Sequence, residues 1–270
     1  MSEEAKEMSF LGHLEELRWH LVRSAVVIFV LAIVLFVFRE EIYNNFIIAH
    51  THSDFVTYRF FCQVFGAIGI ESSFCDVQIP SKLQALSPTQ QLMSSLWVSM
   101  VLGVIIAFPY LLWEMWRFIA PGLHKTERNK SRGFLFIASL LFFIGVLFSY
   151  YVIMPMSVSF FYGYKISDSI VNNFTLDSYI SLFTNTMLGI SLVFELPVVI
   201  YFLSKLGLVT PEFLRKYRKH SLVLVLILSA IITPPDVASQ IIVSIPILIL
   251  YEVGIYISGF VQKRQLKNAK

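Results

Sequence analysis

Residues 134–157 read FLFIASLLFFIGVLFSYYVIMPMS and carry no charged side chain. A helix of this length spans roughly 36 Å at 1.5 Å per residue, which exceeds the roughly 30 Å hydrocarbon core of a bilayer. Polar residues are few in it, and no turn signal divides its first half. The stretch therefore predicts a membrane-spanning helix, around which the rest of the chain can be interpreted.

Further apolar runs repeat this pattern at Leu21–Phe38, Leu92–Trp113, Ser178–Leu203, Ser221–Ile232 and Val237–Val261. The chain is 56% hydrophobic and 14% charged, whereas soluble domains are about 45–50% apolar and about 25% charged. We predict an all-α polytopic membrane protein with six transmembrane helices in one domain, residues 1–270. The expected spans are about 21–38, 92–117, 134–156, 178–203, 221–232 and 237–259, with a larger connection at 39–91.

The basic residues fall in alternate connections. Connections 119–133 and 204–220 and both termini are rich in Lys and Arg, while the other connections hold only Arg39, Arg59, Lys82 and Lys165 of the 21 basic residues. Basic connections stay in the cytoplasm, so we predict that both termini are cytoplasmic. The acidic N-terminus, without a cleavage signal after the first apolar run, predicts that this run is retained as a helix.

Two features predict a thin, bent bundle. The run Ser221–Ile232 would make a helix of only roughly 18 Å, and the residues Thr233–Asp236 that follow it contain two prolines and cannot continue a helix. We therefore expect the fifth and sixth helices to form a short hairpin. Four runs contain an internal proline, at Pro109, Pro155, Pro197 and Pro246; each either bends its helix into a concave wall or is tolerated with a mild kink.

Charged residues near the cytoplasmic side are the first functional candidates. Apolar residues recur at helical spacing in Phe10–Ser24, which predicts an amphipathic helix lying in the interface and running into the first span. Its polar face holds Glu15, Glu16, Arg18 and His20 and is either a binding surface or simply solvated. Glu127, the one acid of its connection, either neutralises neighbouring bases or accepts a guanidinium.

Other acids lie in or beside the apolar runs. Glu195 interrupts the fourth run, where an ionisable side chain is costly and marks a candidate functional site. Glu252 lies nearer the cytoplasmic end of its run and can reach the interface. Asp236 begins the sixth run and is expected to cap free backbone N–H groups.

Several classes of site have no support in the sequence. No phosphate-binding loop, zinc-protease motif or nucleophile elbow occurs, so no cofactor, metal, nucleic acid or enzymatic activity is predicted. His50 and His52 have no third ligand nearby and are interpreted as loop residues. Cys62 and Cys75 lie in the connection 39–91 and form either a disulfide or two separate thiols.

Four segments resemble the TatC family, the signal-peptide receptors of the twin-arginine translocase. They are HLEELRWHL (13–21), YLLWEMWRFIAPGLHKTER (110–128), FELPVVIYFL (194–203) and TPPDVASQIIVSIPILILYEVGI (233–255). The resemblance covers nearly the whole chain, in order and with the same six-span plan. It implies a receptor rather than an enzyme, located in the bacterial inner membrane, where it recognises folded cargo and transport is driven by the proton-motive force.

The resemblance also implies roles for individual residues. Glu16 and Glu127 would hold the two arginines of a twin-arginine signal peptide, while Arg18, Leu21 and Phe118 would shape that site. Glu195 would form an intramembrane polar site that contacts partner helices, and Pro234, Pro235 and Asp236 would form the extracytoplasmic turn. The implied partners are TatA and TatB-type single-span subunits, membrane lipid and further copies of the same chain.

The chain departs from the family pattern in the connection 39–91. Gln90 and Gln91 stand where many members carry an acid, and the segment FIIAHTH (46–52) lacks a proline that often follows the first helix. Docking of partners on that side is therefore less certain. The alternative function is a proton-coupled transporter of a small solute, with Glu195 and Glu252 as coupling groups; the absence of an internal repeat counts against it.

Overall fold

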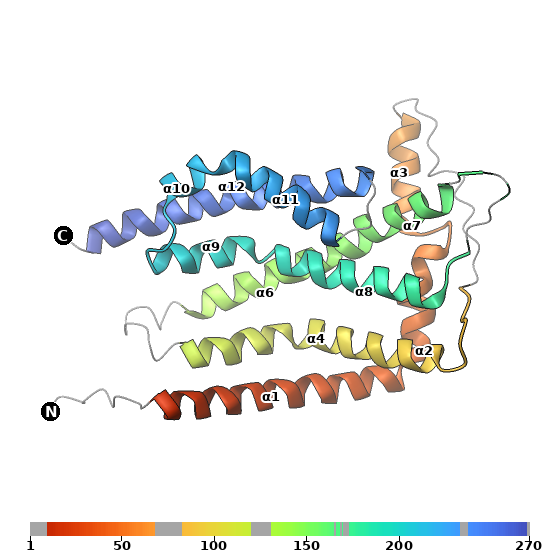
Figure 1. Cartoon of the computed structure of the whole chain (residues 1–270), viewed down its shortest axis with the longest axis horizontal. Coiled ribbons are helices and arrows are strands. Elements are labelled where there is room, and N and C mark those ends of the chain that lie inside the picture. Colours follow the sequence, from red (N-terminus) through yellow and green to blue (C-terminus); the bar gives the residue numbers. More distant parts are fainter. Residues whose placement is uncertain are drawn as a thin grey trace. The chain divides into compact units, whose positions relative to one another are not determined.

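The computed structural model of the chain describes residues 10–67, 83–119, 131–164, 166–167, 169, 173–232 and 237–268. Over these residues the secondary structure is helical, with one isolated parallel bridge between Gln84 and Thr175, which confirms the predicted all-α class. Figure 1 shows the whole chain, whose backbone contacts divide it into two compact units. Unit 1 comprises Met1–Arg39 and Ser95–Ser139, and unit 2 comprises Glu40–Ser94 and Leu140–Lys270.

Unit 1 is built on α1 (Phe10–Val37) and most of α4 (Gln90–Ile119), with the start of α6 (Ser131–Phe148). The amphipathic segment runs into the first apolar run as predicted, but the two form the single continuous helix α1 rather than a separate helix in the interface followed by a span. Gly103 lets α1 and α4 touch through their backbones. A Cβ atom at this position would lie 3.2 Å from the carbonyl oxygen of Ile28 and 3.3 Å from the nitrogen of Ala32. A small residue at position 103 therefore sets the separation of the two helices.

Unit 2 contains the remaining helices. They are α2 (Arg39–Ile42), the π-helix η1 (Tyr43–Ile47), the 3-10 helix η2 (Ile48–Thr51), α3 (Val56–Ala67), the π-helix η4 (Ser149–Ile153), α7 (Met154–Gly163), α8 (Leu176–Val193), α9 (Leu196–Lys205), α10 (Pro211–Lys216), α11 (Arg218–Ile232) and α12 (Val237–Asn268). Thr175 and Thr210 cap α8 and α10 by accepting hydrogen bonds from the backbone N–H groups of Ser178 and Phe213.

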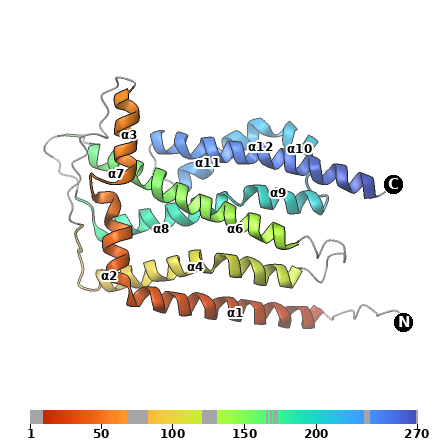
Figure 2. The same cartoon turned by 180° about the vertical axis from the view of Figure 1, so that it is seen from behind.

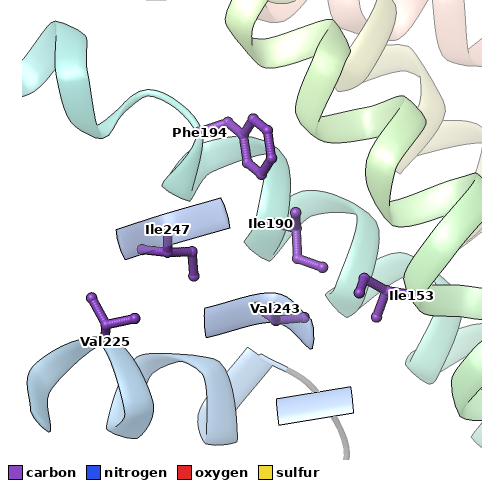
Figure 3. Close-up of a cluster of buried hydrophobic side chains, with 6 residues drawn as sticks. All are labelled: Ile153, Ile190, Phe194, Val225, Val243 and Ile247. Carbon is purple, nitrogen blue, oxygen red and sulfur yellow. The ribbon is translucent and has the colours of Figure 1, made fainter. Parts of the chain in front are cut away.

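Two apolar clusters hold unit 2 together. The larger one brings side chains of η4, α8, α11 and α12 to a common centre (Figure 3): Ile153, Ile190, Phe194, Val225, Val243 and Ile247. The smaller one joins α9, α10 and α12, and both views place α9 beside α12 (Figures 1 and 2). There a Cβ atom at Gly254 would lie 2.3 Å from Ile200 Cδ1, so a larger residue at position 254 would require the Ile200 side chain to move.

Within the described residues, five helical stretches are long and apolar enough to cross a membrane: Leu14–Val37, Gln90–Phe118, Leu135–Gly163, Leu176–Lys205 and Gln240–Gln265. The chain is therefore a multi-pass membrane protein. The predicted fifth span corresponds to α11, whose 15 residues make it shorter than these five. The number of six spans, the single domain and the cytoplasmic termini remain predictions.

The four prolines act differently. Pro109 and Pro246 lie inside the continuous helices α4 and α12. Pro197 follows a turn at Phe194–Glu195 that separates α8 from α9, and Pro155 follows the π-helix η4. Only the latter two coincide with an interruption of the regular helix.

Two backbone carbonyls before Pro155 are contacted by side chains from another segment. The carbonyls of Tyr150 and Tyr151 lie five and four residues before Pro155, which has no N–H to donate. His50 Nε2 lies 2.9 Å from the Tyr150 oxygen, and the Thr57 hydroxyl donates to the Tyr151 oxygen. The segment containing η2 and α3 thus provides hydrogen-bond partners for the carbonyls of Tyr150 and Tyr151.

His50, interpreted from the sequence as a loop residue, lies on the 3-10 helix η2. It is fully buried, and its ring packs against those of Phe55 and Tyr150. The nearby Tyr58 hydroxyl donates to the carbonyls of His50 and Pro155, at 2.9 and 3.1 Å. Burial lowers the pKa of His50 to about 4, although the carbonyls of Ile47 and Tyr150 favour the protonated ring.

The buried histidine predicts a specific loss of stability in acid. The unfolded chain protonates His50 near its ordinary pKa of 6.5 and the folded chain only near about 4. The free energy of unfolding should therefore fall from about pH 6.5 and lose about 3 kcal/mol by about pH 4. Thermal unfolding in detergent can be compared between the wild type and His50→Gln, which keeps a donor but does not titrate. A stability difference that stays constant from pH 7 to pH 4.5 would refute this account.

Candidate functional site

A buried carboxylate ties α1 to α4 within unit 1. Glu114 on α4 is only 1% exposed, and His20 Nδ1 on α1 makes a short contact with its Oε2 atom. The Tyr110 hydroxyl donates to Oε1 at 2.8 Å. Arg117 Nη1 lies 3.7 Å from Oε1, and Arg23 Nη1 lies 4.0 Å from Oε2. Both carboxylate oxygens are therefore supplied with donors and with positive charge.

Helical spacing explains how this cluster forms. Tyr110 and Arg117 lie one turn before and after Glu114 on α4, so all three share a face. His20 and Arg23 share a face of α1 in the same way. The Arg117 guanidinium also lies 4.9 Å from the centre of the Trp113 ring, which orients it. The cluster thus follows from residues three or four apart on two helices that touch.

One helical turn before His20, α1 carries an acid whose Oε2 atom has no hydrogen-bond partner. Glu16 lies four residues before His20 and is half-buried, and its Oε2 atom is buried without a hydrogen-bond partner. Phe118 lies four residues after Glu114, and its ring meets that of His20 edge to face at 6.1 Å between centroids. Glu16 and Phe118 therefore extend the face on which His20 meets Glu114, and Glu16 still has an oxygen free to accept a donor.

Arg18 and Leu21 lie on other faces of α1. Arg18 is exposed, pairs with Glu15 at 3.8 Å and lies over the Trp19 ring. Leu21 is 61% exposed. Within the described residues, neither is hydrogen-bonded or ion-paired to the Glu114 cluster, and Glu127, the second predicted acid, lies outside the described residues.

Glu195 is a second buried acid without partners. It lies at the turn between α8 and α9, is 7% exposed, and neither of its carboxylate oxygens has a hydrogen-bond partner. Its own carbonyl accepts from the N–H groups of Val198 and Val199. A buried carboxyl without partners is costly in an apolar environment, so this position calls for a donor from another molecule, a bound water or a proton.

The other predicted residues add no site within the described chain. Glu252 pairs with Arg218 at 2.7 Å and is partly exposed, which agrees with its expected reach to the interface. Pro234, Pro235, Asp236 and Cys75 lie outside the described residues, and Cys62 lies on α3. The disulfide and the extracytoplasmic turn remain predictions. No group of three or more potential metal ligands occurs among the residues whose placement is described.

The sequence pattern does not single out Glu114 or the role of His20. The second apolar run, Leu92–Trp113, ends one residue before the acid, and His20 falls on the polar face of the amphipathic helix. The signal was present in the spacing of Tyr110, Glu114 and Arg117, which places an acid between a hydroxyl and a base on one helical face.

The buried pair predicts non-additive effects of substitution. Removing one partner leaves the other buried and unpaired, which costs about 3–5 kcal/mol, whereas apolar residues at both positions are often tolerated. Each of His20→Met and Glu114→Met should therefore lower thermal stability in detergent more than the double variant does. Additive losses in this double-mutant cycle would show that the two side chains are not coupled.

Comparison with known proteins places the chain in a family. The family described as Sec-independent protein translocase protein (TatC) matches residues 12–246. The TatC protein of Blattabacterium sp. subsp. Periplaneta americana (strain BPLAN) is 38% identical over 98% of this chain and all of its own length. The TatCd protein of Bacillus subtilis (strain 168) is 31% identical over 97% of this chain and 96% of its own length.

The fold agrees with this comparison. The crystal structure of a protein described as a twin arginine translocase receptor, TatC, superposes with a TM-score of 0.67 at 30% identity, over 93% of this chain and 99% of the other. A second crystal structure with the same description, determined in DDM, gives a TM-score of 0.69 at 31% identity. The sequence match and the fold agree over nearly the whole length, and the chain therefore belongs to the TatC family of Sec-independent protein translocase proteins.

Proposed function

We propose that the chain is the signal-peptide receptor of a twin-arginine translocase and binds the arginine pair of the signal at the Glu16 end of α1. Membership of the TatC family supports a role in Sec-independent translocation. The observation that carries the finer proposal is the buried, unpaired Oε2 atom of Glu16 beside the closed Glu114 cluster. The chain would act as a receptor and not as an enzyme.

The geometry of unit 1 favours Glu16 over its neighbours as the acceptor. Glu114 already has donors on both carboxylate oxygens, and Glu15 is exposed and paired with Arg18. Glu16 combines partial burial with a free oxygen, and burial strengthens a charge-assisted bond to a guanidinium. A planar guanidinium forms two parallel bonds with a carboxylate, which an ammonium cannot do, so arginine would be preferred over lysine.

The other predicted residues complete the proposed site. Glu127 would hold the second arginine, Phe118 would supply an apolar wall, and Arg18 and Leu21 would contact flanking parts of the signal. Glu195 would receive a polar group from a TatA or TatB-type helix, because both of its oxygens are buried without partners. Self-association of the chain and contacts with lipid would complete the receptor complex.

The proposed orientation in the membrane follows from the distribution of Lys and Arg among the connections. With both termini in the cytoplasm, Glu16 would face the compartment in which folded cargo is made, and the protein would lie in the bacterial inner membrane. The proton-motive force would drive the transport step. The segment Pro234–Asp236 would then turn on the opposite, extracytoplasmic side.

Binding of a synthetic signal peptide tests the proposal. The protein in nanodiscs should bind a twin-arginine peptide more tightly than a twin-lysine peptide. Glu16→Gln and Glu127→Gln should each weaken binding about 5- to 150-fold, the equivalent of about 1–3 kcal/mol. The matched control is Glu15→Gln, an exposed acid one residue away, which should change the affinity less than about twofold.

Two results would contradict the receptor site. One is equal affinity for the arginine and lysine peptides, and the other is an equal effect of Glu15→Gln and Glu16→Gln. If no peptide binds to the folded protein and proteoliposomes take up a small solute with protons, the transporter function would replace the receptor function.

A further inference from the structure

Helix α3 runs across the direction of the neighbouring helices of unit 2. In both views it stands crosswise to α7, α8 and α12, which run along one another (Figures 1 and 2). Because α8 and α12 contain candidate membrane spans, a crosswise helix at their end lies roughly along the plane of the bilayer. This orientation is typical of helices at a membrane surface.

The start of α3 is fixed at the depth of a span. The Thr57 hydroxyl contacts the Tyr151 carbonyl, and the Tyr58 hydroxyl lies 3.1 Å from the Pro155 carbonyl. Both acceptors belong to the apolar stretch Leu135–Gly163, and Tyr151 lies about 18 Å along the helix before its end at Gly163. The first turn of α3 is therefore level with the apolar part of this stretch rather than beyond it.

The exposed side of α3 is divided into an apolar stripe and a polar flank. Val56, Phe60 and Val64 follow one another at intervals of four residues and are 60%, 58% and 37% exposed. Arg59 and Gln63 are also exposed and lie one residue earlier, which places them about 100° to one side of Phe60 and Val64. The buried Tyr58 lies on the opposite side, whereas the buried Thr57 lies only about 60° from the middle of the stripe.

We propose that α3 is seated in the lipid interface, with Val56, Phe60 and Val64 among the acyl chains and Arg59 at the phosphates. Three observations carry this proposal: the crosswise direction, the anchoring at span depth, and the sharp division of the exposed surface. A guanidinium binds a phosphate through two parallel bonds, so the single cation beside the stripe favours an anionic headgroup. The proposal does not depend on the signal-peptide site or on which leaflet is involved.

Photo-crosslinking identifies what covers the stripe. Each variant carries p-benzoyl-phenylalanine at one position and is illuminated in nanodiscs of phosphatidylglycerol and phosphatidylethanolamine, and its intact mass is then measured. Replacement of Phe60 or Val64 should give a mass increase of one phospholipid, as should replacement of Ile144, which is exposed in the middle of a span. Replacement of the exposed Asp54, before the helix begins, should give at least severalfold less lipid adduct.

A second variant tests the headgroup. With the crosslinker at Phe60, Arg59→Gln should lower the ratio of phosphatidylglycerol to phosphatidylethanolamine adducts severalfold, while the matched change Gln63→Ala should leave that ratio unchanged. Absence of lipid adducts at Phe60 and Val64, with the Ile144 adduct present, would overturn the proposal. Adducts to a second copy of the chain in place of lipid would also overturn it, because the stripe would then be a protein interface.

Discussion

A polar group that is removed from water inside an apolar helical bundle must find its partner within the protein, and this constraint shapes both units of the chain. In unit 2, Pro155 cannot donate to the carbonyls before it, and His50 and Thr57 satisfy them. In unit 1, Glu114 is surrounded by donors from two helices, among them His20. In each case one polar requirement fixes how separate segments pack.

Among the buried polar groups that do not meet this constraint, two acids are candidates for function. Oε2 of Glu16 and both carboxylate oxygens of Glu195 are buried without hydrogen-bond partners, whereas Glu114 has several. An unsatisfied buried carboxylate is costly to a bundle, so such a group calls for a donor from another molecule, a bound water or a proton. The Glu114 cluster also fixes the position of Glu16, because His20, a member of the cluster, lies one helical turn after Glu16 on α1.

The membrane-spanning character and the helical conformation of α1 could be predicted because long apolar runs and helical spacing are local properties of the sequence. The Glu114 cluster could not, because His20 is 94 positions away and only the contact of α1 with α4 brings them together. His50 was misjudged for a similar reason. Nothing near His50 in the sequence indicates that its ring nitrogen meets the Tyr150 carbonyl, 100 positions later. Long-range polar pairs of this kind need the fold.

Solid-state NMR of the lipid-embedded complex tests the central claim, that the open carboxylate of Glu16 receives an arginine. The signal peptide would carry 15N in its two guanidinium groups and the protein 13C in its glutamate carboxyl groups. The account predicts a guanidinium–carboxyl dipolar contact that disappears in Glu16→Gln and persists in Glu15→Gln. If every such contact survives in Glu16→Gln while the peptide remains bound, Glu16 is not the acceptor and the proposed site is wrong.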